Sequence, residues 1–501
     1  MHQSSVPSSG LSVILLVLLV VGASGPSLGA GARNSGGART AAPAPKPSED
    51  PRFIQFDPNI PGVVDAMLDP GYWAARCPDP DRVIMTPDEI ARFNRANLRQ
   101  CEVLKDLRRF RRVVPGDEVR QMIAKVSRRP SKTVYRHGQP VEPAYFDALE
   151  QALNASAVPD LVTVRFGVTV KRTEMRAFPT TDQIFEEPDD YEFDQFMETA
   201  LYPLEPLAIL HESADGKWFL AQAYHYLAWV PVADVAIGER AELFRWLDAE
   251  PFLVVTGKHV FTTYNPLRPE ISELQLDMGV RIPLARREEI PLEIDGQHPA
   301  GSWVVKLPAR SPAGRLEWRL GLISRADEVR VGYLPLTARH TLIQAFRFLG
   351  QRYGWGGMFN TRDCSAFIMD IFRSMGVYLP RNAGEQGKLS LGLTHPMPKE
   401  MPLAERCALF DRLPPGSPVY MEGHAMLYIG KEAGDYYIIH DFSGFNVPDA
   451  DGKMKRSKAR LVFVTPLLAI YLSNGKSWME GLYAAREFRL EEATHRQGKQ
   501  P

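Results

Sequence analysis

The order of helical and strand-like segments along this 501-residue chain limits the folds available to it. Helical signals occupy residues 86–153, and short runs of β-branched and aromatic residues, separated by turn signals, follow from 161 to 336. Closely spaced short strands are typical of small β-barrels. From about residue 338, two helical segments precede a strand-rich stretch, an order typical of an α+β domain. We therefore predict a multidomain chain with a small helical N-terminal unit, two small β-barrels and a C-terminal α+β domain.

End signals predict individual helices within this outline. Thr86 is a suitable N-cap, and Pro87 and two acidic residues follow it, so a helix should begin there. Further helices are predicted over 116–126, 143–153 and 341–351, where apolar residues recur at helical spacing.

The N-terminus has the pattern of a targeting segment. An apolar run over 11–21 is too short to span a bilayer as a helix, and the small residues at 30–32 suit cleavage by a signal peptidase. We expect a signal peptide over 1–32 and a flexible linker over 33–50, which is rich in Gly, Ala, Ser and Pro. The protein would then be exported, periplasmic or extracellular, with no stable membrane span after cleavage. The alternative is a disordered apolar tail.

Composition excludes few functions but weighs against one class of partner. Hydrophobic residues make up 45% of the chain and charged residues 24%, and the formal net charge is -1. A nucleic-acid partner would require a concentrated basic surface, so we expect none. The sequence does not indicate an oligomeric state.

The four cysteines allow two readings of the N-terminal unit. Cys77 and Cys101 are close in sequence, and export permits disulfides, so they either pair or remain separate thiols. Cys407 is expected to stay unpaired. The spacing of Cys and His residues does not suggest zinc, and we expect no metal and no cofactor.

A cysteine at the start of a buried helix is the first chemical signal. Three glycines surround Trp355, and Asp363 can cap a helix whose apolar residues recur three and four apart after Cys364. The free N–H groups and the dipole of a helix start favour a thiolate. A small buried apolar cysteine is the alternative.

Two histidines supply what a nucleophilic cysteine needs. His424 precedes one apolar strand and His440 ends the next, and a hairpin folded near residue 432 would place them opposite each other. One imidazole could then orient the other, which gives a base and its orienting partner. Ordinary polar packing of two histidines on a hairpin is the alternative.

Several separated motifs resemble the signature of the NlpC/p60 cysteine peptidases. The resemblance covers about residues 338–475. It departs at Ala366, where the family usually has Gly, and we expect this difference to have little effect. It implies that Cys364 is the nucleophile, His424 the base and His440 the third polar residue. The matching stretches are Tyr353-Gly354-Trp355-Gly356-Gly357, Asp363-Cys364-Ser365, Leu379-Pro380-Arg381-Asn382 with Gln386, and His424 through Gly430.

The upstream region is similar to the bacterial SH3 domains that precede the catalytic domain in γ-D-glutamyl-L-diamino-acid endopeptidases. The similarity rests on residues 170–180, 215–218 and 229–230, and residues 181–200 look like an insertion. The expected domains are a helical N-terminal domain over 51–158, SH3-like domains over 159–238 and 239–336, a catalytic domain over 337–488 and a polar tail over 489–501.

These resemblances imply hydrolysis of the γ-D-glutamyl–diaminopimelate (or L-Lys) bond in peptidoglycan-derived peptides with a free N-terminal L-Ala. Asp363, beside the thiol, could bind the substrate ammonium or simply cap the helix, and Ser365 could add a hydrogen bond. Tyr353 is the oxyanion candidate. Trp355, Glu174 and Tyr226 complete the expected substrate-binding residues. The alternatives are a non-catalytic wall-binding protein and an amidase or acyltransferase on the same fold.

Overall fold

The structure is a computed structural model that describes residues 60–449 and 451–490. The expected signal peptide over 1–32 and linker over 33–50 lie outside these residues, as does nearly all of the expected polar tail over 489–501. These three expectations therefore remain predictions.

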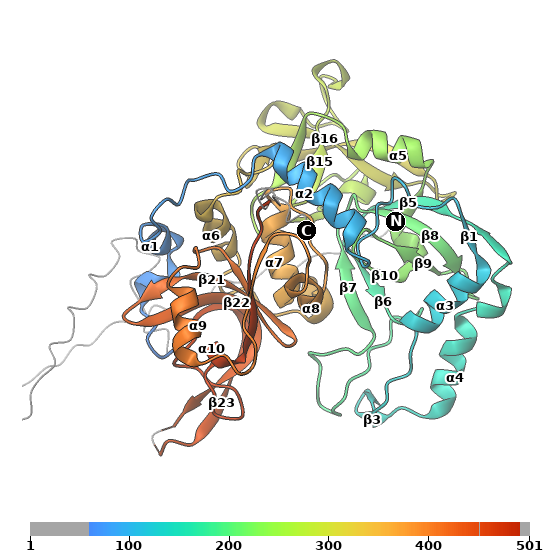
Figure 1. Ribbon diagram of the computed structural model, residues 1–501. Helices are drawn as coiled ribbons and strands as arrows, with labels where there is room; N and C mark the ends of the chain where they lie inside the picture. Colours follow the sequence, from blue (N-terminus) through green and yellow to red (C-terminus); the bar gives the residue numbers. More distant parts are fainter. Residues whose placement is uncertain (1–59, 450, 491–501) are drawn as a thin grey trace, which may run out of the picture. The chain divides into compact units, whose positions relative to one another are not determined.

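The helices predicted near the N-terminus form with bounds close to those expected. Figure 1 shows α1, Pro70–Ala74; α2, Pro87–Gln100; α3, Gly116–Val126; and α4, Pro143–Ala152. Thr86 accepts a hydrogen bond from the Glu89 amide, and the Glu89 carboxylate returns one from the Thr86 amide, which is a capping box. Local signals set these ends, so the sequence was sufficient to predict them.

These helices do not share one core, in contrast to the single helical domain expected over 51–158. Trp73 of α1 and Phe93 of α2 are fully buried among apolar residues of the C-terminal part, including Phe367. Ile123 of α3 and Phe146 of α4 instead belong to the core of the first β-rich unit. A helix buries its apolar face wherever a matching surface exists, and periodicity alone does not identify that surface.

The first β-rich unit, residues 165–237, is built on a seven-stranded antiparallel sheet in the order β11-β5-β8-β9-β10-β6-β7. The indole of Trp229 is fully buried in its core. The strands are β5, Arg165–Thr169; β6, Thr173–Arg176; β7, Met197–Leu201; β8, Pro206–Glu212; β9, Trp218–Gln222; β10, Leu227–Pro231; and β11, Val235–Ile237.

The second β-rich unit, residues 252–331, consists of a three-stranded sheet and two hairpins and follows helix α5, Arg240–Leu247. Its strands surround one apolar core that includes Leu253, Ile282 and Val305. They are β12, Phe252–Val255; β13, His259–Phe261; β14, Gln275–Asp277; β15, Arg281–Pro283; β16, Ser302–Arg310; β17, Leu316–Ser324; and β18, Val329–Val331.

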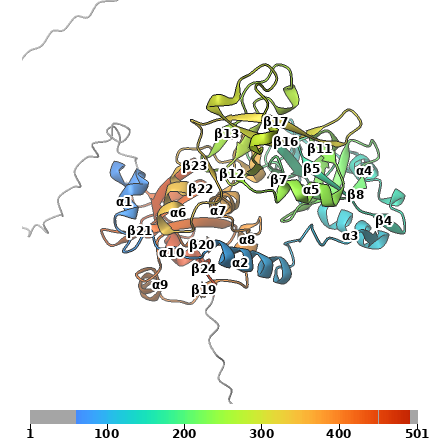
Figure 2. The same ribbon diagram turned by 90° about the horizontal axis from the view of Figure 1, so that it is seen from above.

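The C-terminal unit, residues 338–488, packs helices against a six-stranded antiparallel sheet in the order β19-β24-β20-β21-β22-β23. Helix α7 lies beside β21 and β22 (Figures 1 and 2). The helices are α6, Ala338–Phe346; α7, Cys364–Arg373; α8, Ala383–Gly387; α9, Leu403–Phe410; and α10, Trp478–Gly481. The strands are β19, Leu393–Pro396; β20, Pro418–Met421; β21, His424–Glu432; β22, Asp435–Pro448; β23, Met454–Pro466; and β24, Leu482–Glu487. The chain is thus multidomain, with β-rich units before a C-terminal domain of mixed helix and sheet.

Buried ion pairs connect both β-rich units to the region of α7. The Arg362 guanidinium donates to Asp277 of the second unit at 3.0 Å and to Asp370 of α7 at 3.1 Å. Arg373, at the end of α7, donates to Glu205 of the first unit at 2.6 Å. Because unpaired charges inside a protein are very costly, these contacts fix the β-rich units against the helix that carries Cys364.

Cys77 and Cys101 do not pair. All four cysteines lie among the described residues, and each is a free thiol. Cys77 and Cys101 are only partly buried. The structure therefore agrees with the second of the two expectations, in which Cys77 and Cys101 remain separate thiols.

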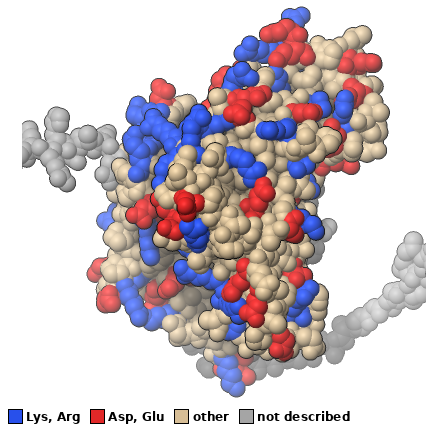
Figure 3. Space-filling view, turned by 90° about the vertical axis from the view of Figure 1, so that its right-hand side faces the viewer, with Lys and Arg blue, Asp and Glu red and all other residues tan. Residues whose placement is uncertain are grey.

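The surface of the described residues carries both signs of charge. Lysine and arginine side chains are interspersed with acidic ones over most of the face drawn in Figure 3, with one gathering of basic residues near its upper left edge. Among the described residues, no helix combines enough length and apolar character to cross a membrane.

Candidate active site

The glycine-rich loop before α7 is shaped by a close approach to strand β7. Gly356 and Gly357 have φ angles of 61° and 107°, in the region that favours glycine. A Cβ atom at Gly357 would lie 2.5 Å from that of Ala200, and one at Gly356 would lie 2.7 Å from the Met197 side chain. Arg172 donates to the carbonyl of Gly357 at 3.0 Å. The first β-rich unit therefore forms one wall beside the start of α7.

Cys364 is the first residue of α7, as the sequence predicted. The Asp363 carboxylate caps the helix by accepting from the Ala366 amide at 3.0 Å, and Gly376, with a φ of 82°, lies beyond its end. The first four amides of a helix have no partner within it, so the Cys364 N–H is available as a donor.

The thiol of Cys364 is held neutral in this arrangement. Burial raises its pKa to about 12, and the neighbouring Asp363 carboxylate adds to the increase. The Ala425 amide, next to His424 in the chain, lies within hydrogen-bonding reach of the sulfur and opposes the increase. Burial of the thiol thus opposes the thiolate that the helix start was expected to favour.

The two histidines form a relay. The Nε2 atom of His424 lies 2.9 Å from Nδ1 of His440, whose Nε2 lies 3.0 Å from the Thr465 hydroxyl. Nδ1 of His424 is buried and has no hydrogen-bond partner among the described residues. If His424 carries its proton on Nε2 and donates it to His440, the lone pair on Nδ1 is free to accept a proton.

The register of this pair differs from the sequence prediction. The turn is at residues 433–434 and the ladder shifts between Tyr428 and Gly430, so that Leu427 pairs with Ile439. Continuing that pairing places Phe442, not His440, opposite His424, and the two imidazoles meet across a diagonal. The displaced turn causes this difference, and the shift between Tyr428 and Gly430 offsets it by one residue.

Both imidazoles are neutral under ordinary conditions. Burial lowers the pKa of His424 to about 3, although the Asp363 carboxylate works against this shift. Burial and the neighbouring His424 lower the pKa of His440 well below its usual value. The resting site thus pairs a neutral thiol with a neutral base.

A cluster around Arg381 lies beside the thiol. The Arg381 guanidinium donates to the two oxygens of Asp363 at 2.7 and 3.0 Å, to Ser365 at 2.8 Å and to the Thr199 hydroxyl of β7 at 2.7 Å. The charge of Arg381 holds the pKa of Asp363 below its usual value, against the effect of burial. Asp363 and Ser365 are therefore both part of this cluster, and Asp363 is the helix cap as well.

Glu198 is the acidic residue that sequence reasoning missed. It accepts a hydrogen bond from the Tyr226 hydroxyl, and burial raises its pKa while the Arg381 charge lowers it. Tyr226 is thus brought to the cluster as expected. Glu174 is not, because its half-exposed carboxylate binds Arg176 at 2.9 Å. Glu198 lies within residues 181–200, which looked like an insertion in the sequence, so no motif singled this residue out.

Tyr353 and Trp355 belong to the glycine-rich loop that precedes α7. Burial raises the pKa of the Tyr353 hydroxyl well above its usual value, and the nearby Cys364 and Asp363 add to the shift, so it stays a donor. Trp355 is 38% exposed and meets the edge of the Phe193 ring at 5.8 Å between centroids. Tyr353 therefore suits an oxyanion donor, and Trp355 is available to a ligand.

Asp441 is a second residue that the sequence did not single out. It follows His440 on β22 and is completely buried, and neither carboxyl oxygen has a hydrogen-bond partner among the described residues. Burial raises its pKa well above the usual value, and its charge contributes to the raised pKa values of Cys364 and Tyr353. A buried carboxyl therefore faces the reactive region.

Two family models match this chain. Residues 350–460 match the NlpC/P60 family, and residues 183–231 match the SH3 domain of the SH3b1 type. The first match spans the glycine-rich loop, α7 and both histidine strands, and the second spans β7 to β10.

Two curated relatives share a printed name, gamma-D-glutamyl-L-lysine dipeptidyl-peptidase. The Bacillus subtilis (strain 168) protein is 36% identical over 72 residues, which are 14% of this chain and 24% of that protein. The Bacillus cereus (strain ATCC 10987 / NRS 248) protein is 28% identical over 165 residues, 32% of this chain and 44% of that protein. The chain thus spans less than half the length of the curated relatives that it matches.

A solved structure shares the fold over most of the chain. It is described as a novel NlpC/P60 endopeptidase from Photobacterium damselae subsp. piscicida, with a TM-score of 0.65 and 17% identity. The similarity covers 83% of this chain and 96% of that one. The C-terminal part of the chain is an NlpC/P60 family domain, and an SH3 domain of the SH3b1 type precedes it.

Proposed function

We propose that this chain is a cysteine peptidase that hydrolyses the γ-D-glutamyl–diaminopimelate (or L-Lys) bond of cell-wall stem peptides with a free N-terminal L-Ala. The observation that carries the proposal is the arrangement beside Cys364, where the Arg381 guanidinium binds Asp363 and its charge also acts on the nearby Glu198 carboxyl. The printed name of the curated relatives supports the choice of bond.

The proposed reaction starts from the neutral thiol of Cys364 and the neutral imidazole of His424. The Cys364 sulfur attacks the carbonyl carbon while Nδ1 of His424 takes the thiol proton, and Nδ1 of His440 accepts a hydrogen bond from Nε2 of the resulting imidazolium. The Cys364 N–H and the Tyr353 hydroxyl receive the developing oxyanion. The C–N bond then breaks as His424 returns the proton to the leaving amine. Water, deprotonated by His424, hydrolyses the thioester and releases the γ-D-glutamyl acid and the thiol.

Charge balance explains why a free amine would be selected. Arg381 contributes one positive charge against the carboxylates of Asp363 and Glu198, so one negative charge is left when both are ionised. A substrate ammonium two residues before the scissile bond would neutralise it. A neutral acetamide would leave that buried charge unpaired, which is costly. At the end of the site that would bind the ammonium, the wall formed by β7 would also exclude a glycan-linked lactyl group.

A non-catalytic wall-binding role is less well supported. Binding alone requires neither a thiol nor a buried base, yet the Cys364 thiol lies within reach of the Ala425 amide, and the adjacent His424 lies 2.9 Å from His440. We also propose that the protein acts outside the cytoplasm, on the basis of the apolar segment over 11–21.

The experiment compares L-Ala-γ-D-Glu-diaminopimelate with its N-acetylated form, using wild-type protein and two matched variants. We expect acetylation to reduce wild-type kcat/KM at least tenfold, or about 1.4 kcal/mol. Glu198→Gln should lose most of this preference, whereas Glu174→Gln, the same change in a half-exposed pair, should keep it. Equal cleavage of both peptides by the wild type, or efficient digestion of intact sacculi, would overturn the proposed specificity.

A further inference from the structure

A large cavity lies at the end of α7 that is remote from Cys364. It encloses about 780 Å³ and is lined by α2, by both β-rich units and by the segment that follows α7. Cys364 begins the helix and Arg373 ends it, so the cavity and the thiol are separated by about 14 Å of helix. We call this space the α7-end cavity. It is distinct from the site proposed for peptide hydrolysis.

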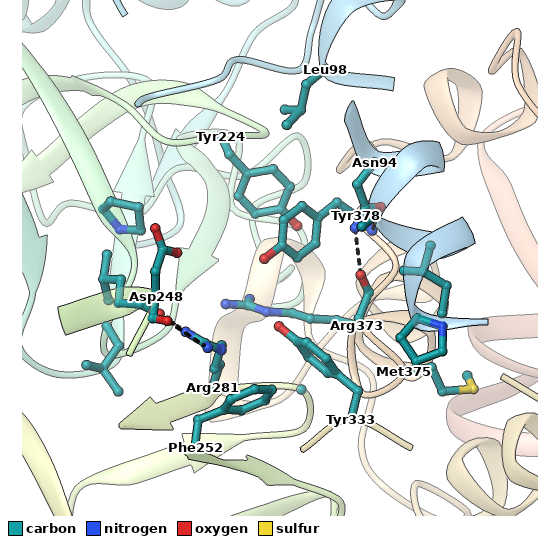
Figure 4. A pocket seen from close by; sticks show the side chains of 18 of the residues that line it. Asn94, Leu98, Tyr224, Asp248, Phe252, Arg281, Tyr333, Arg373, Met375 and Tyr378 are labelled. Atoms are coloured by element: carbon teal, nitrogen blue, oxygen red, sulfur yellow. Dashed lines mark hydrogen bonds between the residues drawn. The ribbon is translucent and has the colours of Figure 1, made fainter. Parts of the chain in front are cut away.

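Tyrosines dominate the centre of the α7-end cavity. Figure 4 shows the side chains of Tyr224, Tyr333 and Tyr378 converging around the Arg373 guanidinium. Tyr224 and Tyr378 have ring centroids 5.3 Å apart. The surrounding apolar lining includes Ile90, Leu98, Leu204, Leu247, Phe252 and Met375. A cavity of this size with mostly apolar walls and a few converging polar groups is typical of small-molecule sites.

Most charged groups in the lining already have a partner of opposite charge. Arg373 donates to Glu205 at 2.6 Å, and Arg108 donates to Asp248 at 3.1 Å. Arg281 donates to main-chain carbonyls at the end of α5 and to Glu250 at 3.2 Å. A strongly charged ligand would have to displace one of these partners, so the cavity favours an uncharged ligand.

An uncharged hydrogen-bond donor in the lining remains available. The Tyr224 hydroxyl is buried and has no hydrogen-bond partner among the described residues. Burial also raises its pKa, so it remains an O–H donor. Buried polar groups are almost always hydrogen-bonded, which makes this hydroxyl the natural donor to an acceptor on a ligand.

We propose that the α7-end cavity binds an uncharged amphipathic small molecule with an aromatic or branched apolar body and one hydrogen-bond acceptor. The body packs among the tyrosine rings, Phe252 and Met375, and the acceptor receives the Tyr224 hydroxyl. The inference rests on the cavity alone and does not depend on the proposed peptidase activity.

The test uses the uncharged fluorescent naphthalene ketone Prodan, whose single carbonyl is an acceptor, with the purified full chain. We expect saturable binding of one molecule per chain with blue-shifted emission. Tyr224→Phe should weaken binding about three- to tenfold, the range expected for one lost hydrogen bond. Leu98→Trp should abolish it by filling the cavity, whereas Leu292→Trp, at a residue that is 82% exposed, should not.

Three results would overturn the proposal. These are the absence of saturable Prodan binding, equal binding by the Leu98→Trp and Leu292→Trp variants, and unchanged affinity in Tyr224→Phe. Tighter binding of anilinonaphthalene sulfonate, an anion of similar size, would overturn the assignment to uncharged ligands. Circular dichroism establishes that each variant is folded, and Tyr224→Phe keeps the test decisive if Leu98→Trp does not fold.

Discussion

Arg381 holds Asp363 through two nitrogens, at 2.7 and 3.0 Å, directly beside the residue that carries the thiol. Both side chains are buried. The chain contains an exposed pair of the same geometry, in which Arg339 donates to the two oxygens of Asp81 at 2.7 and 2.8 Å. The same contact thus occurs in two environments, and the difference between them can be measured.

Arg381→Met should reduce the free energy of unfolding by about 3–5 kcal/mol, because it leaves the Asp363 carboxylate buried without its cation. Arg339→Met should have a much smaller effect, because water solvates Asp81. Urea unfolding followed by circular dichroism measures both. If the two variants lost the same stability, the buried Arg381–Asp363 pair would not contribute more to the free energy of unfolding than the exposed pair does.

Replacement of His424, the proposed base, should reduce kcat more than replacement of its partner His440. His424→Ala should reduce kcat about 10²–10⁴-fold, the usual contribution of a general base. His440→Ala should reduce it less, and His440→Gln less again, because an amide can still bind His424 Nε2. Steady-state kinetics on the free-amine tripeptide measures this order. A His440→Ala variant that is as damaged as His424→Ala would argue against a purely orienting role.

The pH profile should lack an acid limb near the ordinary histidine pKa. The neutral form of His424 is the base, and burial lowers its pKa to about 3, so the base form persists as pH falls through 6.5. An alkaline limb is expected at about pH 8, where the substrate ammonium deprotonates. kcat/KM measured from pH 4 to 10 tests both limbs. An acid limb with an apparent pKa of 6.5 or higher would contradict the neutral resting pair.

Asp441 should make the thiol harder to ionise. Burial raises the pKa of Cys364 to about 12, and the Asp441 carboxyl contributes to that increase. Alkylation by iodoacetamide should therefore be slow at pH 7 and accelerate with pH, and Asp441→Asn should accelerate it at pH 8. Cys364→Ala provides the background from the other three thiols. A wild-type rate that is already maximal at pH 6 would indicate a thiolate–imidazolium pair instead.

Local signals in the sequence were sufficient for some features and not for others. The predicted bounds of α2 and α3 agree with the structure because caps and apolar periodicity are local. The pairing of His424 with His440 was predicted two residues out of register, because the turn is at residues 433–434 and not near 432 as the sequence suggested.

The cluster around Arg381 shows the limit of the sequence most clearly. Glu198 reaches it only because β7 packs against the glycine-rich loop, a contact between segments more than 150 residues apart. Trp73 likewise packs on Tyr437, and Phe93 on Phe488, across a long sequence separation. Tertiary packing determines these contacts, and no local pattern in the sequence predicts them.

Analysis of the reaction products identifies the bond that is cut. Purified wild-type protein and the Cys364→Ala variant are incubated with L-Ala-γ-D-Glu-diaminopimelate, and the products are identified by mass spectrometry. The account predicts L-Ala-γ-D-Glu and free diaminopimelate from the wild type and intact tripeptide from the variant, with both proteins equally folded. Turnover by the Cys364→Ala variant near the wild-type rate, or release of free L-Ala instead, would contradict it.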